Sequence, residues 1–144
     1  MANKETTVRR LIDDIWNAGK LDTLDQLVTS DVAHHDPVNP TRGIEPLRNV
    51  VRKYRTAFPD MHQHIDELFA GGDRVAARLT CTGTQRGPLD GLAPTGRSVK
   101  IDALLICHFT GDRVSEAYVN WDALGMMQQL GAVTLPGKTA AAGA

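Results

Sequence analysis

The spacing of apolar residues changes near residue 60, and this change constrains the fold more than any other feature of the sequence. Before it, apolar residues recur every three or four positions, which is the spacing of one buried helix face. The first such face comprises Val8, Leu11, Ile12, Ile15 and Trp16. After residue 60, apolar residues alternate with polar ones, which is the spacing of strands. Helices followed by strands predict an α+β fold with a curved antiparallel sheet around the N-terminal helices.

Helix and strand boundaries follow from the residues that stop each pattern. A short second helix is expected from Leu21 to Val28, and a third from near Gly43 to Pro59, because proline ends a helix. A final helix is expected from Asp122, a good capping residue, to Leu130. We expect a short strand at the start of the segment 31–39, and four further strands over 61–69, 73–84, 98–109 and 113–121.

Length and charge set broad limits on the class of protein. The chain has 144 residues, so we expect one domain over 1–135 and a flexible tail over 136–144. The 16 basic and 17 acidic residues nearly cancel, so capture of nucleic acid or an anionic membrane is not expected. No apolar run is long enough to span a bilayer, and the first residues form no apolar signal stretch. We therefore expect a cytoplasmic protein.

The strand over 98–109 is apolar on both faces. Leu104 and Ile106 are apolar although they alternate with the residues of the main apolar face. Such a strand is covered on both sides, so we expect helices inside and a second subunit outside, which makes the protein a homodimer. Cys81 and Cys107 lie in apolar surroundings without zinc-site spacing. Both are expected to be buried free thiols.

Few residues are suited to chemistry, and no nucleotide, zinc-protease or serine-hydrolase motif is present. His34, His35 and Asp36 lie between the second and third helices. A histidine there could enter a pocket as a general base or acid, and His35 is the preferred candidate. Alternatively, Asp36 forms a turn with Pro37 and the histidines are solvated. Asp122 is either a pocket acid or base, or only a helix cap.

The remaining candidates have equally plain structural alternatives. Trp16 and Trp121 could stack on a flat ligand or simply fill the core. His62 and His64 could form a metal-binding pair, but no third ligand of suitable spacing is visible, so we expect a solvated strand edge. His108 has the parity of the outward-facing residues of its strand and is expected to point away from a pocket.

Several motifs, taken in order, resemble one family. They are HDP at residues 35–37, FPD after the third helix, GDRVAARLTCTGTQRG, APTGR, and GDRVSEAY followed by spaced D, G and QQLG. Over residues 5–133 their order and spacing resemble the SnoaL-like polyketide cyclase family. The resemblance implies an NTF2-like α+β cone. It also implies cofactor-independent enzymes that act on aromatic polyketides, commonly as homodimers.

The resemblance also implies where acid–base residues should lie. The family's characterised cyclases close a ring by an intramolecular aldol reaction, with an aspartate and a nearby histidine on the last two strands. Counting without gaps from the terminal motif places these roles at Val119 and Leu105, which cannot move a proton. His108 and Asp122 have the same separation, but using them requires a three-residue slip that exchanges strand faces. The related hydroxylase branch is therefore preferred, acting on a polycyclic intermediate.

This hypothesis requires an apolar hollow, flat stacking surfaces and one proton acceptor. The expected catalytic residues are His35 and Asp122. The expected substrate-binding residues are Trp16, Tyr54, Leu105, Phe109, Val119 and Trp121. No metal or bound cofactor is expected, and any reductant would come from a separate partner protein. Ring closure, a non-catalytic binding module, and a hydrolase or isomerase on the same cone remain alternatives. A filled hollow, or His35 and Asp122 both facing bulk water, would contradict the enzymatic hypothesis.

Overall fold

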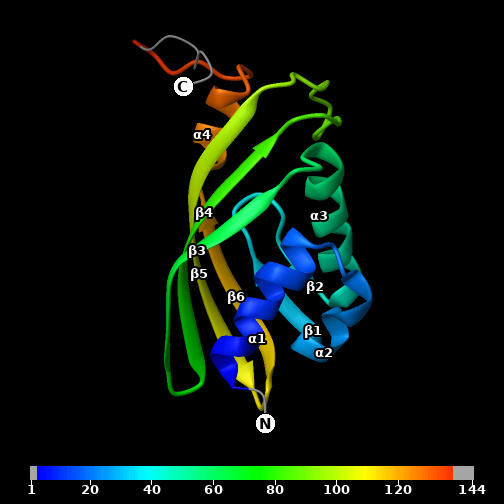
Figure 1. The fold of residues 1–144 in the computed structure, drawn as a ribbon, viewed down its shortest axis with the longest axis vertical. Helices are drawn as coiled ribbons and strands as arrows, with labels where there is room; N and C mark the ends of the chain where they lie inside the picture. Colours follow the sequence, from blue (N-terminus) through cyan, green and yellow to red (C-terminus); the bar gives the residue numbers. More distant parts are fainter. Residues whose placement is uncertain (1–2, 138–144) are drawn as a thin grey trace.

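The computed structural model describes residues 3–137 (Figure 1). Its helices and strands follow the predicted order, except that the short strand β2 was not predicted. The elements are α1 (Lys4–Arg10), the π-helical segment η1 (Leu11–Asn17), the 3-10 turn η2 (Leu21–Thr23), α2 (Leu24–Leu27), β1 (Val28–His35), β2 (Thr41–Arg42), α3 (Ile44–Ala57), β3 (His62–Gly71), β4 (Arg74–Thr84), β5 (Ser98–Thr110), β6 (Arg113–Trp121) and α4 (Ala123–Gln129). The predicted α+β class is confirmed. The tail predicted over 136–144 lies, from residue 138 onward, outside the described residues.

Within residues 3–137, six strands form one curved, unclosed sheet in the order β2-β1-β6-β5-β4-β3 (Figure 1). Neighbouring strands are antiparallel except β1 and β6, which run parallel. The prediction of an antiparallel sheet is therefore wrong for one ladder. Parallel neighbours need a long crossover connection, and here that connection contains α3 and the four strands β2, β3, β4 and β5. The crossover brings the end of β1 beside the end of β6.

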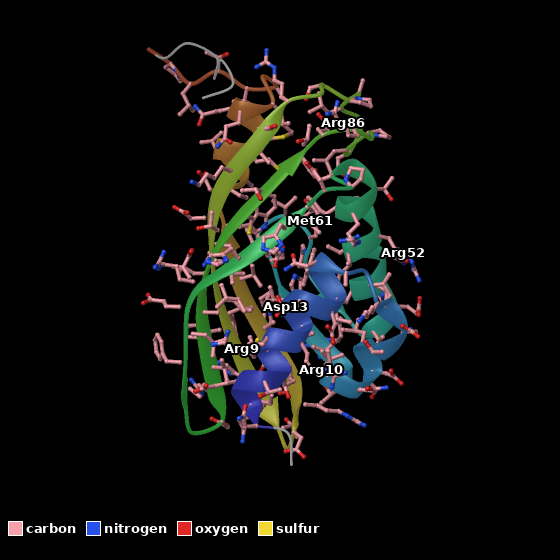
Figure 2. All side chains as sticks on the ribbon, viewed as in Figure 1. Arg9, Arg10, Asp13, Arg52, Met61 and Arg86 are labelled. Atoms are coloured by element: carbon pink, nitrogen blue, oxygen red, sulfur yellow. The ribbon has the colours of Figure 1, made fainter. Side chains whose placement is uncertain are left out.

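The helices α1, α2 and α3 gather on one side of the sheet (Figure 1). The predicted face of the first helix lies there: Val8, Leu11, Ile12 and Ile15 are buried and Trp16 is partly buried. Leu47 and Val51 of α3 are buried there too. Arg52 of α3 points away from the sheet (Figure 2). Burial of each large aliphatic side chain contributes about 1.5–3 kcal/mol, so this face holds α3 in place. No helix within residues 3–137 has the length and apolar character needed to cross a lipid bilayer.

The end of η1 is fixed by two contacts with distant residues. The Arg55 guanidinium donates to the carbonyl oxygens of Trp16 and Asn17 at 2.8 and 2.7 Å, which the helix end leaves without partners. The Asn17 side chain accepts from the backbone N–H of Gln63 at 2.7 Å and donates to its carbonyl at 2.9 Å. These bonds join η1 to α3 and β3, and they fix Trp16 beside the sheet.

The loop over residues 85–97 is organised by Gln85, whose side chain is fully buried. Its amide bonds to Gly87, Leu92, Ala93 and Thr95. Gly87 approaches α3 so closely that a Cβ atom there would lie 2.5 Å from the Thr56 carbonyl oxygen. The loop therefore packs against the end of α3, where Asp90 lies 3.1 Å from the Lys53 ammonium.

The other side of the sheet is exposed and carries an outer apolar patch of three residues. Leu104, Ile106 and Tyr118 are 58%, 45% and 43% exposed. His108 lies beside this patch, with its ring 5.0 Å from that of Tyr118, so its predicted outward direction is confirmed. The predicted homodimer stays a prediction, and this patch is the surface it would use.

Candidate functional site

A cavity of about 140 Å³ lies between the helices and the sheet and opens to solvent. Its wall is mostly aliphatic and aromatic. A protein cavity of about 150 Å³ accommodates benzene, so at least one aromatic ring fits inside. The polar side chains of the wall are few; among them are His34, Asp36, Tyr54, Gln63 and Thr82. A mainly apolar wall with a few polar groups is typical of a small-molecule site.

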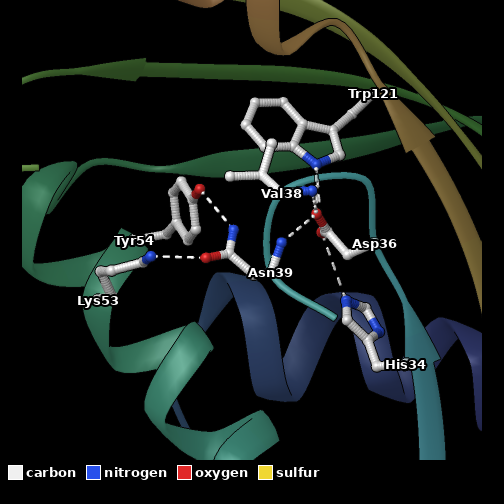
Figure 3. A network of polar contacts seen from close by, with 7 residues as sticks. All are labelled: His34, Asp36, Val38, Asn39, Lys53, Tyr54 and Trp121. Atoms are coloured by element: carbon white, nitrogen blue, oxygen red, sulfur yellow. Dashed lines mark hydrogen bonds and ion pairs between the residues drawn. The ribbon is translucent and has the colours of Figure 1, made fainter. Parts of the chain in front are cut away.

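His34 and Asp36 form the titratable pair of the cavity (Figure 3). Each side chain is only 7% exposed, and His34 Nε2 lies 3.6 Å from Asp36 Oδ2. This distance suits an ion pair with a protonated histidine but is too long for a good hydrogen bond. Within the described part of the chain, His34 Nε2 has no hydrogen-bond partner although it is buried. The nitrogen is therefore available to a ligand.

Asp36 is held by groups that all donate to its carboxylate. Oδ1 accepts from the backbone N–H groups of Val38 and Asn39 at 2.8 and 2.9 Å, which is the turn predicted at Asp36 and Pro37. The Trp121 indole N–H lies 3.1 Å from both carboxylate oxygens. One side chain therefore shapes the turn after β1 and joins it to the end of β6.

These contacts determine the charge of Asp36. Burial alone would raise the pKa of this carboxyl, but the contacts with His34, Asn39, Val38 and Trp121 outweigh burial and lower the pKa from 3.8 to about 2. The carboxylate is therefore ionised at neutral pH and is a weak base. Of the two side chains, His34 is the candidate proton acceptor, because its buried Nε2 has no hydrogen-bond partner within the described residues.

The structure places five of the six expected substrate-binding residues in the cavity wall: Trp16, Tyr54, Leu105, Val119 and Trp121. The Trp121 and Tyr54 rings pack edge to face with their centroids 5.9 Å apart. Phe109 is the exception and is a correction to the prediction. It is buried, but it lies beyond a register shift near the end of β5, and its ring faces the Lys4 ammonium at 5.9 Å.

The prediction that His35 enters the cavity is wrong. Its side chain is 43% exposed, Nε2 lies 2.9 Å from Glu116 Oε2, and the ring stacks on Tyr118. Successive strand residues point to opposite faces, so His34 and His35 cannot both face the cavity. The pairing of β1 with β6 changes register between Val28 and Ala33, and after this irregularity His34 is the inward residue.

Asp122 is also outside the cavity wall, and its prediction as a pocket acid or base is wrong. It is exposed, and Oδ1 accepts from the backbone N–H of Gly125 at 2.8 Å at the start of α4. The helix-cap alternative is therefore correct. Both His35 and Asp122 are exposed and outside the cavity wall, which is the outcome stated above to contradict the enzymatic hypothesis that assigned them. An acid–base role in the cavity would have to come from His34 and Asp36 instead.

Leu105 and Val119 are direct partners across β5 and β6, and both line the cavity. Counting from the terminal motif gave these positions to the family's acid–base pair, but neither aliphatic side chain has a group that can accept or donate a proton. His108, on the outer side, cannot replace them. The titratable pair of this cavity, His34 and Asp36, lies instead at the end of β1.

The other titratable candidates are two histidines and two cysteines. His62 and His64 are exposed on β3, as expected of a solvated strand edge. Burial raises the pKa of the Cys107 thiol to about 12, and burial followed by nearby acidic groups does the same for Cys81. Both are free thiols, and such high values exclude them as nucleophiles at neutral pH.

An α+β cone around an apolar cavity with one buried histidine–aspartate pair defines a class of proteins with a built site for a small molecule. The model of the SnoaL-like polyketide cyclase family matches residues 6–130. The chain belongs to this family, and its predicted NTF2-like fold is confirmed. No curated protein matches the sequence.

Solved structures agree with this assignment. A candidate SnoaL-like polyketide cyclase from Jannaschia sp. CCS1 is 26% identical, with a TM-score of 0.82 over 93% of this chain and 98% of that one. IdmH from Streptomyces antibioticus, a candidate polyketide cyclase, is 27% identical, with a TM-score of 0.79 over 90% and 99%. AclR from Streptomyces galilaeus, a candidate hydroxylase, is 23% identical, with a TM-score of 0.79 over 92% and 87%, which supports the fold alone.

Proposed function

We propose that this protein is a tailoring enzyme of aromatic polyketides in which His34 moves a proton of a substrate held in the apolar cavity. One observation carries the proposal: among residues 3–137, the buried Nε2 of His34 finds no hydrogen-bond partner, and it lies 3.6 Å from an ionised carboxylate. A buried polar atom without a partner costs about 1–3 kcal/mol. A substrate that exchanges a proton with this nitrogen would remove that cost.

The cavity suits removal of a proton from carbon next to a carbonyl group. Exclusion of water strengthens charge interactions inside an apolar site. When His34 accepts the proton, the imidazolium is stabilised by Asp36, which stays ionised because its pKa is about 2. The indole rings of Trp16 and Trp121 in the wall supply flat apolar surfaces for a ring.

The overall reaction that we propose is ring closure by an intramolecular aldol reaction. His34 takes a proton from the nucleophilic carbon, and that carbon attacks a carbonyl carbon of the same molecule, so that one C–C bond forms and the C=O π bond breaks. The alkoxide oxygen then takes the proton back from His34, and atoms and electrons balance. This reverses the preference drawn from the sequence, because His34 and Asp36 supply the acid–base capacity that Leu105 and Val119 lack.

Hydroxylation is the second candidate, because Leu105 and Val119 line the cavity where the resemblance implies an acid–base pair in the cyclases. The same carbanion would then react with dioxygen instead of a carbonyl carbon. One oxygen atom would enter the product and the other would leave as water. The two electrons for this reduction would come from a separate reductase partner.

The experiment compares turnover of polyketide methyl esters in air and under nitrogen. Ring closure should proceed equally in both, whereas turnover that requires oxygen would refute ring closure and favour hydroxylation. His34→Gln should lower kcat about 100-fold or more. His35→Gln is the matched control. His35 is the next residue in the chain, but its side chain lies on the outer face of the sheet, so this substitution should leave kcat unchanged. A folded His34→Gln variant with wild-type kcat, or ligand binding without any turnover, would contradict the proposed function.

A further inference from the structure

The direction of the Tyr54 hydroxyl is determined by two residues next to it. Lys53 Nζ lies 2.6 Å from Asn39 Oδ1. A lysine ammonium only donates hydrogen bonds, so the Asn39 amide must present its oxygen to Lys53. The amide nitrogen then faces Tyr54 Oη at 2.8 Å (Figure 3). Because an amide nitrogen also only donates, the Tyr54 oxygen is the acceptor of this bond.

This assignment leaves the one hydrogen of the Tyr54 hydroxyl unused. Within residues 3–137, no acceptor lies within hydrogen-bond distance of this hydroxyl as a donor, and Tyr54 belongs to the cavity wall. Burial raises the pKa of Tyr54 to about 12, with the charges of Asp36 and Asp90 adding to the rise and the Asn39 bond opposing it. The hydroxyl therefore keeps its proton at neutral pH.

We propose that Tyr54 donates a hydrogen bond into the cavity, so that the cavity selects ring compounds bearing an acceptor oxygen such as a ketone, enolate or phenolate oxygen. Asn39 and Lys53 are positioning residues, because both contact Tyr54 but neither belongs to the cavity wall. A purely apolar ring would leave the hydroxyl hydrogen without a partner, which disfavours it relative to a ring ketone of the same shape.

The position of Asn39 also relates Tyr54 to the acid–base pair. The Asn39 backbone N–H donates to Asp36 Oδ1 at 2.9 Å, while its side chain donates to Tyr54. Lys53, which fixes the amide, is anchored in turn by Asp90 of the 85–97 loop at 3.1 Å. One short turn after β1 therefore sets the hydrogen-bond donor and the carboxylate of the cavity relative to each other.

The inference rests on the proposed function for its chemical meaning. A carbonyl oxygen bound to Tyr54 gains negative charge when His34 removes a proton from the adjacent carbon, and a hydrogen bond to a charged oxygen is stronger than one to a neutral oxygen. Tyr54 would thus stabilise the enolate that precedes ring closure. Selection of an acceptor oxygen can nevertheless be measured without turnover.

The experiment measures equilibrium binding of acetophenone and ethylbenzene by calorimetry. The two probes share a ring and a two-carbon chain and differ in the ketone oxygen. Comparing the ratio of their dissociation constants between wild type and variants cancels their different hydration. Tyr54→Phe should weaken acetophenone binding relative to ethylbenzene by about tenfold, or about 1.4 kcal/mol. An unchanged ratio would refute donation by Tyr54.

Asn39→Asp tests the positioning role with Tyr54 intact. The new carboxylate would accept both from Lys53 and from the Tyr54 hydroxyl, turning the hydroxyl hydrogen away from the cavity. The preference for acetophenone over ethylbenzene should therefore fall about as far as in Tyr54→Phe. Lys53→Met frees the Asn39 amide to rotate and should lower the preference for acetophenone by a smaller factor. This variant replaces Asn39→Asp if Asn39→Asp does not fold. In either variant, retained binding of ethylbenzene shows that the cavity is intact.

An unchanged ratio in a folded Asn39→Asp or Lys53→Met variant would refute the positioning role. The outcomes also separate this inference from the proposed function. Oxygen selection that depends on Tyr54, found in a protein without turnover, supports the inference and contradicts only the enzymatic proposal. Turnover that depends on His34, with an unchanged binding ratio in Tyr54→Phe, supports the enzymatic proposal and refutes the inference.

Discussion

Replacing Asp36 by asparagine tests the acid–base pair through stability, without knowledge of the substrate. The pKa of this carboxyl falls from 3.8 to about 2 on folding. Each pKa unit corresponds to about 1.36 kcal/mol, so ionised Asp36 contributes about 2 kcal/mol to the free energy of unfolding. The side chain is 7% exposed, so solvent screening is small. Because folding lowers this pKa, the contribution is present above about pH 4 and is lost as the pH falls toward 2.

The assay is urea denaturation of wild type and Asp36→Asn at several pH values between 7 and 2.5. The free energy of unfolding of the variant should be lower by about 2 kcal/mol at pH 7 and at pH 5, and the difference should shrink steadily below pH 4. Asp112→Asn is the control, since Asp112 is exposed in the turn between β5 and β6. It should stay within about 0.5 kcal/mol of wild type.

Two results would refute this reasoning. A difference that stays constant from pH 7 to pH 2.5 would mean that the loss comes from altered packing rather than from the charge. No difference at pH 7 would mean that the bonds from Trp121, Val38 and Asn39 do not favour the ionised carboxylate, and His34 would then lack the partner proposed for it.

Two further predictions concern the fold and the assembly. Gly87→Ala should lower the free energy of unfolding by about 2 kcal/mol or more, because the new Cβ would meet a carbonyl oxygen of α3. Gly71→Ala is the control: the space around Gly71 is open, so the loss should be less than about 1 kcal/mol. Comparable losses in the two variants would contradict this account. We propose that the outer apolar patch joins two copies of the chain. At one end of the patch, Arg74 and Glu116 lie on opposite sides of His108 of β5, and a twofold axis along β5 would bring them face to face. Ile106→Asp should then be monomeric by light scattering and wild type dimeric, and a monomeric wild type or a dimeric variant would rule out this interface.

The order of helices and strands could be predicted because its signal is local. Alternation over 98–109 predicted a strand, and β5 runs from Ser98 to Thr110 with alternating burial. The helix predicted between Gly43 and Pro59 is α3. The parallel pairing of β1 with β6 had no such signal, because it joins segments that only the completed fold brings together.

The candidate site was predicted in composition but not in detail. The three residues His34, His35 and Asp36 were recognised, yet strand parity could not choose between the histidines, because the buried residues Val32, Ala33 and His34 do not alternate in β1. The turn at Asp36 was predicted from its own neighbours. Its bond to Trp121, 85 residues away in the sequence, could not be, since no local pattern records a contact between two distant segments.

The parallel pairing of β1 and β6 also has a consequence for the order of events during synthesis. A ribosome releases the N-terminal segments first, so β1 emerges long before β6, which is one of its two neighbours in the sheet. Asp36 meets Trp121 only after almost the whole chain has left the exit tunnel. Until then the apolar faces of the first helices are not fully covered by the sheet. A nascent chain stalled before residue 113, where β6 begins, would expose these faces to chaperones.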